Sequence, residues 1–122
     1  MPDVQYTING QINKGSLNQS FAASGVTASM ATAGVVAVTL ELGTATSSVS
    51  TANLGAVGLC FARSLATETT HTVSFGRLNG TSLYETVRLK AGEAAVLRLA
   101  PGNYGAKAAV EGSRIVMTIY ED

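Results

Sequence analysis

The chain begins with apolar and polar residues in alternation, the period-two pattern of a half-buried β-strand. Val4, Tyr6 and Ile8 are the apolar members of this stretch. Asn9-Gly10 follows as a tight-turn signal, so we expect the first strand to end there. The pattern predicts that residues 1–15 form an N-terminal arm or an edge strand.

The next apolar positions are diluted by serine and alanine. They predict a second strand over Leu17–Ala23 and a third over Val26–Met30, with a break at Ser24-Gly25. The pattern is much clearer from Val35 to Leu42. There the apolar side chains predicted to share one face are Val36, Val38, Leu40 and Leu42, while Thr39 and Glu41 lie on the other.

Two stretches in the middle of the chain differ from this regular alternation. Thr44–Asn53 consists almost entirely of small and hydroxylated residues, which predicts a surface loop or a poorly specified edge rather than a core element. Leu54–Ala62 is an apolar run that contains Gly55 and Gly58. Glycine inside a strand pattern predicts a bulge or the close approach of another backbone.

The second half of the chain alternates again. Val73 and Phe75 predict a strand that turns at Asn79-Gly80. Over Leu83–Leu89, alternation groups Glu85 with the apolar residues Leu83, Val87 and Leu89 and leaves Tyr84, Thr86 and Arg88 on the other face. The remaining elements predicted are turns at Lys90–Glu93 and Pro101–Asn103 and strands over Ala95–Leu99 and Arg114–Tyr120.

About eight short strands separated by turn signals are typical of two packed antiparallel sheets. We therefore predict an all-β antiparallel sandwich, with a jelly roll as the leading topology. No internal repeat or change of composition divides the chain, so we expect a single domain over residues 1–122.

Charge is sparse and balanced along the chain. Eight Lys and Arg face eight Asp and Glu, and charged residues make up 13% of the sequence. No net field attracts nucleic acid or a membrane surface, so we expect neither as a partner. Hydrophobic residues make up 46%, and with little charge to oppose self-association we expect a homo-oligomer. Met1-Pro2-Asp3 lacks the features of a signal peptide, and we expect no membrane span.

Candidates for catalysis are few. Cys60 is the only cysteine, which excludes an intrachain disulfide, and the apolar stretch Leu59-Cys60-Phe61 favours a buried thiol. His71 is the only histidine, and its neighbours Thr69, Thr70 and Thr72 provide no orienting group. The carboxylates are scattered without the spacing of a metal site or a glycosidase pair. We therefore expect no enzyme, no catalytic residue, no metal and no cofactor.

From about residue 47 to the C-terminus, the order of several short motifs resembles a family of small bacteriophage virion proteins. The motifs are Ser50-Thr51-Ala52-Asn53-Leu54-Gly55, Phe61-Ala62-Arg63-Ser64-Leu65, Arg88-Leu89-Lys90-Ala91-Gly92-Glu93, Ala95-Val96-Leu97-Arg98-Leu99-Ala100-Pro101-Gly102, Ala106-Lys107-Ala108 and Tyr120-Glu121-Asp122. Such proteins commonly carry Asn-Leu-Asp after the arginine of the second motif and a longer insertion after Pro-Gly, where this chain has Ser64-Leu65-Ala66 and Asn103-Tyr104-Gly105. The resemblance implies a β-sandwich mounted on a phage particle and assembled in the host cytoplasm.

Two functional hypotheses of different classes follow. In the first, the protein is a capsid cement or decoration protein, a homotrimer on the capsid surface that binds the phage major capsid protein. The strand with Val4, Tyr6 and Ile8 would then add to the edge of a partner's sheet. In the second, the protein is a tail-associated module that binds a carbohydrate or receptor through an exposed aromatic, with Tyr84 and Tyr104 as the candidates.

Overall fold

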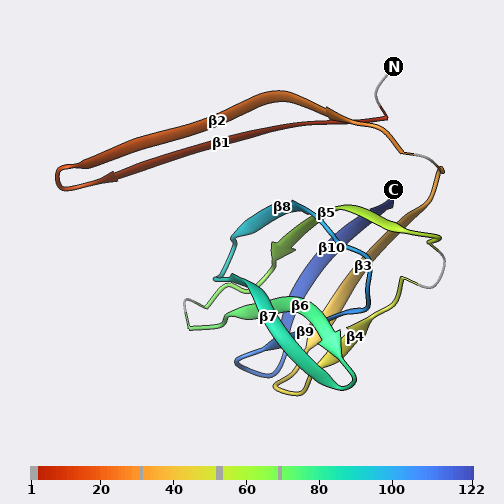
Figure 1. The fold of residues 1–122 in the computed structure, drawn as a ribbon. Coiled ribbons are helices and arrows are strands. Elements are labelled where there is room, and N and C mark those ends of the chain that lie inside the picture. The colour runs from red at the N-terminus through yellow and green to blue at the C-terminus, as the bar shows by residue number, and fades with distance from the viewer. Residues whose placement is uncertain (1–2, 31, 52–53, 69) are drawn as a thin grey trace. The chain divides into compact units, whose positions relative to one another are not determined.

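A computed structural model describes residues 3–30, 32–51, 54–68 and 70–122. Within these ranges the chain is all-β, with ten strands in three antiparallel sheets and no helix. The strands divide between two compact units, Met1–Ala31 and Thr32–Asp122 (Figure 1). Met1-Pro2, Thr69, and Ala52-Asn53 of the predicted loop and first motif lie outside the described residues.

The first unit is a long β-hairpin. Strand β1 spans Val4–Lys14 and strand β2 spans Leu17–Ala28, joined by a two-residue turn at Gly15-Ser16. Gly15 has a φ of +59°, which glycine adopts without strain, and it stands at the first turn position, where a type II′ turn places glycine.

This hairpin corrects two predictions. Asn9-Gly10 lies inside β1, where Gly10 pairs with Phe21, so it is not the turn. A turn at Gly15-Ser16 lets the alternation of β1 continue to Lys14 and meet β2 over its whole length. The predicted second and third strands are one strand, because Ser24-Gly25 forms a bulge opposite Thr7 rather than a break.

The second unit contains two four-stranded sheets. One has the order β3-β10-β5-β8, and the other has the order β4-β9-β6-β7. The strands of the first sheet are β3 (Val35–Leu42), β10 (Ser113–Glu121), β5 (Val57–Ser64) and β8 (Ala94–Arg98). Those of the second sheet are β4 (Ser47–Val49), β9 (Tyr104–Ala108), β6 (Val73–Asn79) and β7 (Ser82–Leu89).

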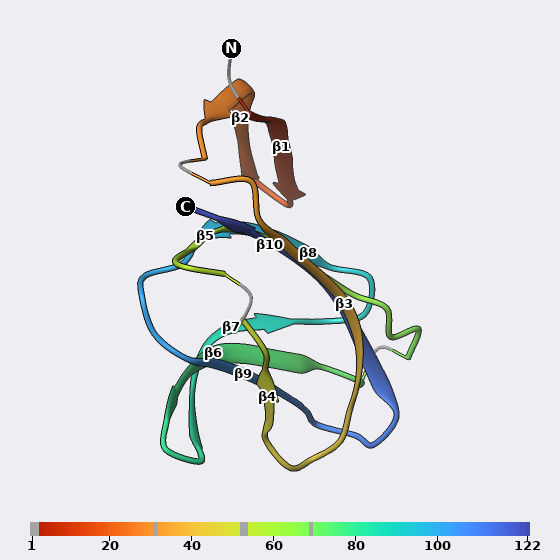
Figure 2. The ribbon, with the colours of Figure 1, turned by 90° about the vertical axis from the view of Figure 1, so that its right-hand side faces the viewer.

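The connectivity of these sheets is that of a jelly roll. Counted from β3, the eight strands run in the order 1-8-3-6 in one sheet and 2-7-4-5 in the other, so the first strand lies at the edge of one sheet and pairs with the last. Two Greek keys folded into two layers produce this order. Figure 2 shows the two layers. The predicted antiparallel sandwich with about eight strands is confirmed.

The core of the sandwich fills the space between the two sheets. Its largest fully buried apolar side chains are Phe75, Leu42, Ile115, Met117, Ile119 and Val73. In β10 the buried residues alternate with more exposed ones, as the sequence predicted. In β3 the residues of the predicted inner face are half-buried, except for Leu42 at the end of the strand, which is buried. The predicted hairpin near Asn79-Gly80 is also confirmed, although its turn residues are Gly80 and Thr81, because Asn79 is the last residue of β6 and pairs with Ser82.

Three local features show which predictions from the sequence pattern hold in the structure and which do not. Gly58 confirms the predicted close approach, since a Cβ on it would lie 2.9 Å from the backbone oxygen of Tyr120. Strand β4 lies at the edge of its sheet, as one of the two alternatives for Thr44–Asn53 predicted, but the burial of Val49 corrects the expectation that this stretch contributes nothing to the core. Strand β9 was not predicted, although it contributes Tyr104, Ala106 and Ala108 to the core.

The sequence predicts a single domain over residues 1–122, with residues 1–15 as an N-terminal arm or an edge strand. The hairpin extends to Ala28, well beyond residue 15, and groups separately from the sandwich. Cooperative folding of the whole chain stays a prediction.

Candidate interaction surface

The two faces of the N-terminal hairpin have different chemistry. Cross-strand partners of an antiparallel pair share a face. The apolar face of the hairpin consists of Val4, Tyr6, Ile8, Gly10, Ile12 and Lys14 of β1 and Leu17, Gln19, Phe21, Ala23, Val26 and Ala28 of β2. The polar face contains the partner pairs Gln5–Thr27, Asn9–Ala22, Gln11–Ser20 and Asn13–Asn18.

The bulge at Ser24-Gly25 keeps the apolar face continuous. Strict alternation after Ala23 would place Gly25 and Thr27 on this face. One extra residue in β2 reverses the phase, so that Val26 pairs with Tyr6 instead. Gly25 takes a φ of +63°, and its backbone N–H donates to the Thr7 hydroxyl at 3.2 Å. The bulge therefore extends one apolar face over the whole hairpin.

Near the turn, this face exposes large apolar side chains. Ile12 is 55% exposed, Leu17 51% and Phe21 63%. The described part of the hairpin carries only two charged residues, Asp3 and Lys14. Apolar residues gathered on one face, with few charges around them, are typical of a protein-binding surface.

The three residues predicted to bind a partner lie on the apolar face. Val4 is buried, and Tyr6 and Ile8 are half-buried, while Gln5 and Thr7 between them are exposed. One edge of β1 pairs with β2, and in the described chain each strand of this two-stranded sheet has one further edge that pairs with no strand. Sequence reasoning missed Ile12, Leu17 and Phe21, because it ended the first strand at Asn9.

Among the described residues, no hydrogen bond joins the side chains of Cys60 and His71. Cys60 lies in the sandwich core at 0% exposure, and desolvation raises the pKa of its thiol to about 11. His71 is half-buried before β6, and its backbone N–H donates to the Glu68 carbonyl at 3.0 Å. Within the described ranges, no group of three or more His, Cys, Asp or Glu side chains could hold a metal ion.

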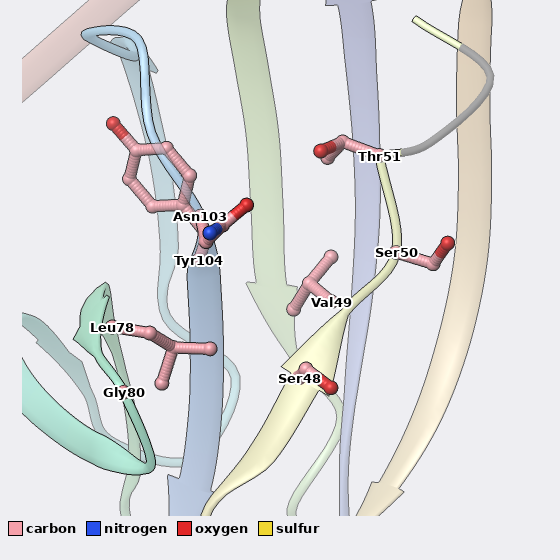
Figure 3. A pocket seen from close by; sticks show the side chains of 8 residues that line it. All are labelled: Ser48, Val49, Ser50, Thr51, Leu78, Gly80, Asn103 and Tyr104. Atoms are coloured by element: carbon pink, nitrogen blue, oxygen red, sulfur yellow. The ribbon is translucent and has the colours of Figure 1, made fainter.

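A cleft of about 450 Å³ lies beside strand β4 (Figure 3). Ser48, Ser50 and Thr51 contribute hydroxyls to its lining, and Leu78, Gly80, Asn103 and Tyr104 line the side across from them. No charged side chain lines it. The Asn103 backbone carbonyl accepts the Leu78 N–H at 2.9 Å, which joins the loop after β8 to strand β6.

The two tyrosines considered for sugar binding have different surroundings. Tyr104 is 5% exposed, and its ring stacks on Phe75 with ring centroids 5.5 Å apart, while its hydroxyl donates to the Ala100 carbonyl. Its ring is therefore part of the core and unsuited to stacking on a sugar. Tyr84 is 60% exposed, and its hydroxyl accepts a hydrogen bond from Asn79 Nδ2 at 2.9 Å.

A second cleft, of about 390 Å³, contains a small charge cluster on the face of the β4-β9-β6-β7 sheet that points away from the core. Glu85 Oε2 lies 2.7 Å from Arg88 Nη2, and Glu85 Oε1 lies 3.1 Å from Lys107 Nζ. These contacts hold the pKa of Glu85 below its ordinary value, chiefly through the hydrogen bonds from Arg88 and Lys107.

This cluster corrects the predicted grouping of Glu85 with the inner face of β7. Phe75 pairs with Val87 and Gly76 with Glu85, which leaves Thr86 as an extra residue. The bulge reverses the alternation, so Glu85 points outward together with Arg88.

No protein-family model, curated protein or solved structure matches this chain. The described part of the chain contains no helix long and apolar enough to cross a membrane.

Proposed function

We propose that this protein is a structural protein of a bacteriophage virion, a cement or decoration protein that binds the capsid shell and stabilises it. The observation that carries the proposal is the N-terminal hairpin, whose continuous apolar face leaves Ile12, Leu17 and Phe21 more than half exposed. The motif resemblance from residue 47 onward supports a place on a phage particle. The role requires no catalytic residue and no cofactor.

The low stability expected of an isolated hairpin supports the proposal that the hairpin binds a partner. A two-stranded sheet alone is at best marginally stable in water, because it cannot bury its apolar face. Docking that face on the major capsid protein would contribute about 25 cal/mol for each Å² of apolar surface removed from water. The free edges of β1 and β2 offer backbone hydrogen bonds to a partner strand as a second source of affinity.

A homo-oligomer can bind a capsid shell more tightly than a single copy can. A homotrimer with closed symmetry presents the same hairpin three times, and it matches a three-fold position of a capsid. Individually weak contacts then combine, because each later contact forms at high effective concentration. The balanced charge of the chain leaves self-association unopposed by net repulsion.

The test combines the mass of the protein in solution with its binding to shells. Light scattering gives the mass, and co-sedimentation measures binding to capsids assembled without this protein. A trimer that sediments with these shells supports the proposal. A protein that stays in the supernatant contradicts it. Deletion of residues 2–9 removes the first six of the eleven residues of β1, and it should abolish shell binding while the sandwich stays folded.

One observation favours the tail-associated alternative. Tyr84 is an exposed aromatic on edge strand β7, and such a ring can stack on a sugar or pack against a receptor. Under this alternative, Tyr84→Ala lowers phage adsorption to its host, and a glycan array identifies a bound sugar. Unchanged adsorption and a silent array count against it.

A further inference from the structure

The cleft that holds the charge cluster has the features of a built site. Ser74 of β6 pairs with Arg88 of β7 on one side and with Lys107 of β9 on the other. Cross-strand partners share a face, so the three side chains form one row across the sheet. The full lining of the cleft is Thr44, Thr72, Ser74, Glu85, Arg88, Lys107, Ala108 and Ala109.

Ser74 stands at the centre of this row with an unused hydroxyl. The residue is 7% exposed, and its hydroxyl has no hydrogen-bond partner among the described residues. No buried side-chain oxygen or nitrogen among the described residues lacks a partner, so this hydroxyl is open to the solvent in the cleft. Because Ser74 lines the cleft, a ligand seated there can supply the missing partner.

The side chains that line the cleft leave one positive charge unbalanced, while the Glu111 carboxylate, which accepts hydrogen bonds from Thr44, lies outside this lining. Arg88 and Lys107 carry two positive charges, and Glu85, which touches both, carries one negative charge. Glu85 uses Arg88 Nη2 and Lys107 Nζ, so the other guanidinium N–H groups and further ammonium hydrogens stay available. The lowered pKa of Glu85 keeps it ionised near neutral pH, so the imbalance persists there.

We propose that this cleft binds the carboxylate side chain of an acidic peptide segment. Arg88 and Lys107 would donate charge-assisted hydrogen bonds to the carboxylate, and the Ser74 hydroxyl would add a third. Glu85 between the two cations disfavours a densely charged polyphosphate. No aromatic residue lines the cleft to stack on a sugar ring. Strand β7 is an edge of its sheet, so a peptide can also pair with its backbone beside Arg88.

The test uses the protein alone and does not depend on shell binding. Capped hexaglutamate, capped hexaglutamine and trigalacturonate are titrated separately into the labelled protein, followed by the amide resonances of Thr72, Ser74 and Ala108. The proposal predicts saturable shifts of these amides with hexaglutamate at moderate salt, none with hexaglutamine and weaker binding of trigalacturonate. Tighter binding of trigalacturonate, or no saturable shift with hexaglutamate, overturns it.

Variants assign the binding to the cleft. Arg88→Gln and Lys107→Gln should each weaken hexaglutamate binding at least tenfold, and Ser74→Ala should weaken it severalfold. Arg98→Gln is the matched control, because Arg98 forms a similar surface ion pair with Asp122 at 2.9 Å on the other sheet. Equal weakening by Arg98→Gln would show general charge attraction and would contradict the site.

Discussion

At Gly58, the lack of a side chain lets β5 pass close to the end of β10. A Cβ at this position would lie 2.9 Å from the Tyr120 carbonyl oxygen and 3.1 Å from the Asp122 backbone nitrogen. Both are backbone atoms, so neither can rotate away. The apolar run around Gly58 predicted this close approach because glycine in a strand has few other uses.

Gly58→Ala should therefore lower the free energy of unfolding by about 1–3 kcal/mol, the usual range for overpacking. Urea denaturation followed by circular dichroism measures the change. Gly10→Ala is the control, since a Cβ on Gly10 meets no atom within 4 Å. Equal stability of the Gly58 and Gly10 variants would show that the close approach is not a tight constraint.

Burial determines the chemistry of Cys60. With a pKa of about 11, the native thiol is about 1% ionised at pH 9, and the thiolate is the reactive form. Iodoacetamide should leave the native protein unmodified at pH 8 over hours and label it rapidly in urea, as mass spectrometry can show. Rapid labelling of the folded protein would mean that the thiol is accessible.

The burial of Cys60 also makes the stability of the fold depend on pH in a defined direction. Folding raises the pKa of the thiol from 9.0 to about 11, so on raising the pH the unfolded chain loses this proton first. The contribution of Cys60 to stability is therefore complete below pH 9 and is lost as the pH rises towards 11.

At the scale of elements, prediction succeeded where large apolar residues alternate. Strands β3 and β10 carry large aliphatic residues at alternate positions, and both were predicted with their faces. Strand β9 was missed, and strand β4 was predicted only as a loop or a poorly specified edge, because Tyr-Gly-Ala-Lys-Ala and Ser-Ser-Val offer no such alternation. Their pairing depends on neighbouring strands, which a local pattern does not contain.

The N-terminal hairpin and the charge cluster around Glu85 also depend on strand pairing that a local sequence pattern does not contain. Asn9-Gly10 and Gly15-Ser16 are both two-residue turn signals, and only the pairing of the whole of β1 with β2 selects the second. The face with Val4, Tyr6 and Ile8 was predictable from alternation. The extension of this apolar face to Phe21 was not predictable from alternation. The outward orientation of Glu85 was not predictable either, because it depends on the bulge at Thr86.

The hairpin should be the least protected element of the isolated protein. Its two strands lack the third strand or packed layer that gives a sheet independent stability within their unit. We expect the amides of β1 and β2 to exchange roughly a hundredfold faster than those of β10, and to become protected on shells. Hydrogen exchange with mass spectrometry measures both. Equal protection in the free protein would contradict a marginally stable arm.

At the scale of the whole molecule, the two units have separate tasks under the proposed function. The jelly roll has its own core, and the proposed function makes the hairpin, which forms a separate unit, the arm that would attach it to the shell. Binding must then depend on one face of the hairpin. Substitutions on the apolar and polar faces should therefore differ in effect although they lie side by side along the same strands.

The most direct test is co-sedimentation with capsids that lack the protein. It compares the wild type, the apolar-face variant Ile12→Ser/Phe21→Ser and the polar-face control Gln11→Ala/Ser20→Ala. Losing two half-exposed apolar contacts costs about 2 kcal/mol or more, so the apolar-face variant should bind more than tenfold more weakly. The control should bind like the wild type, and circular dichroism should show all three folded. Equal binding by all three would contradict the assignment of the hairpin as the shell-binding arm.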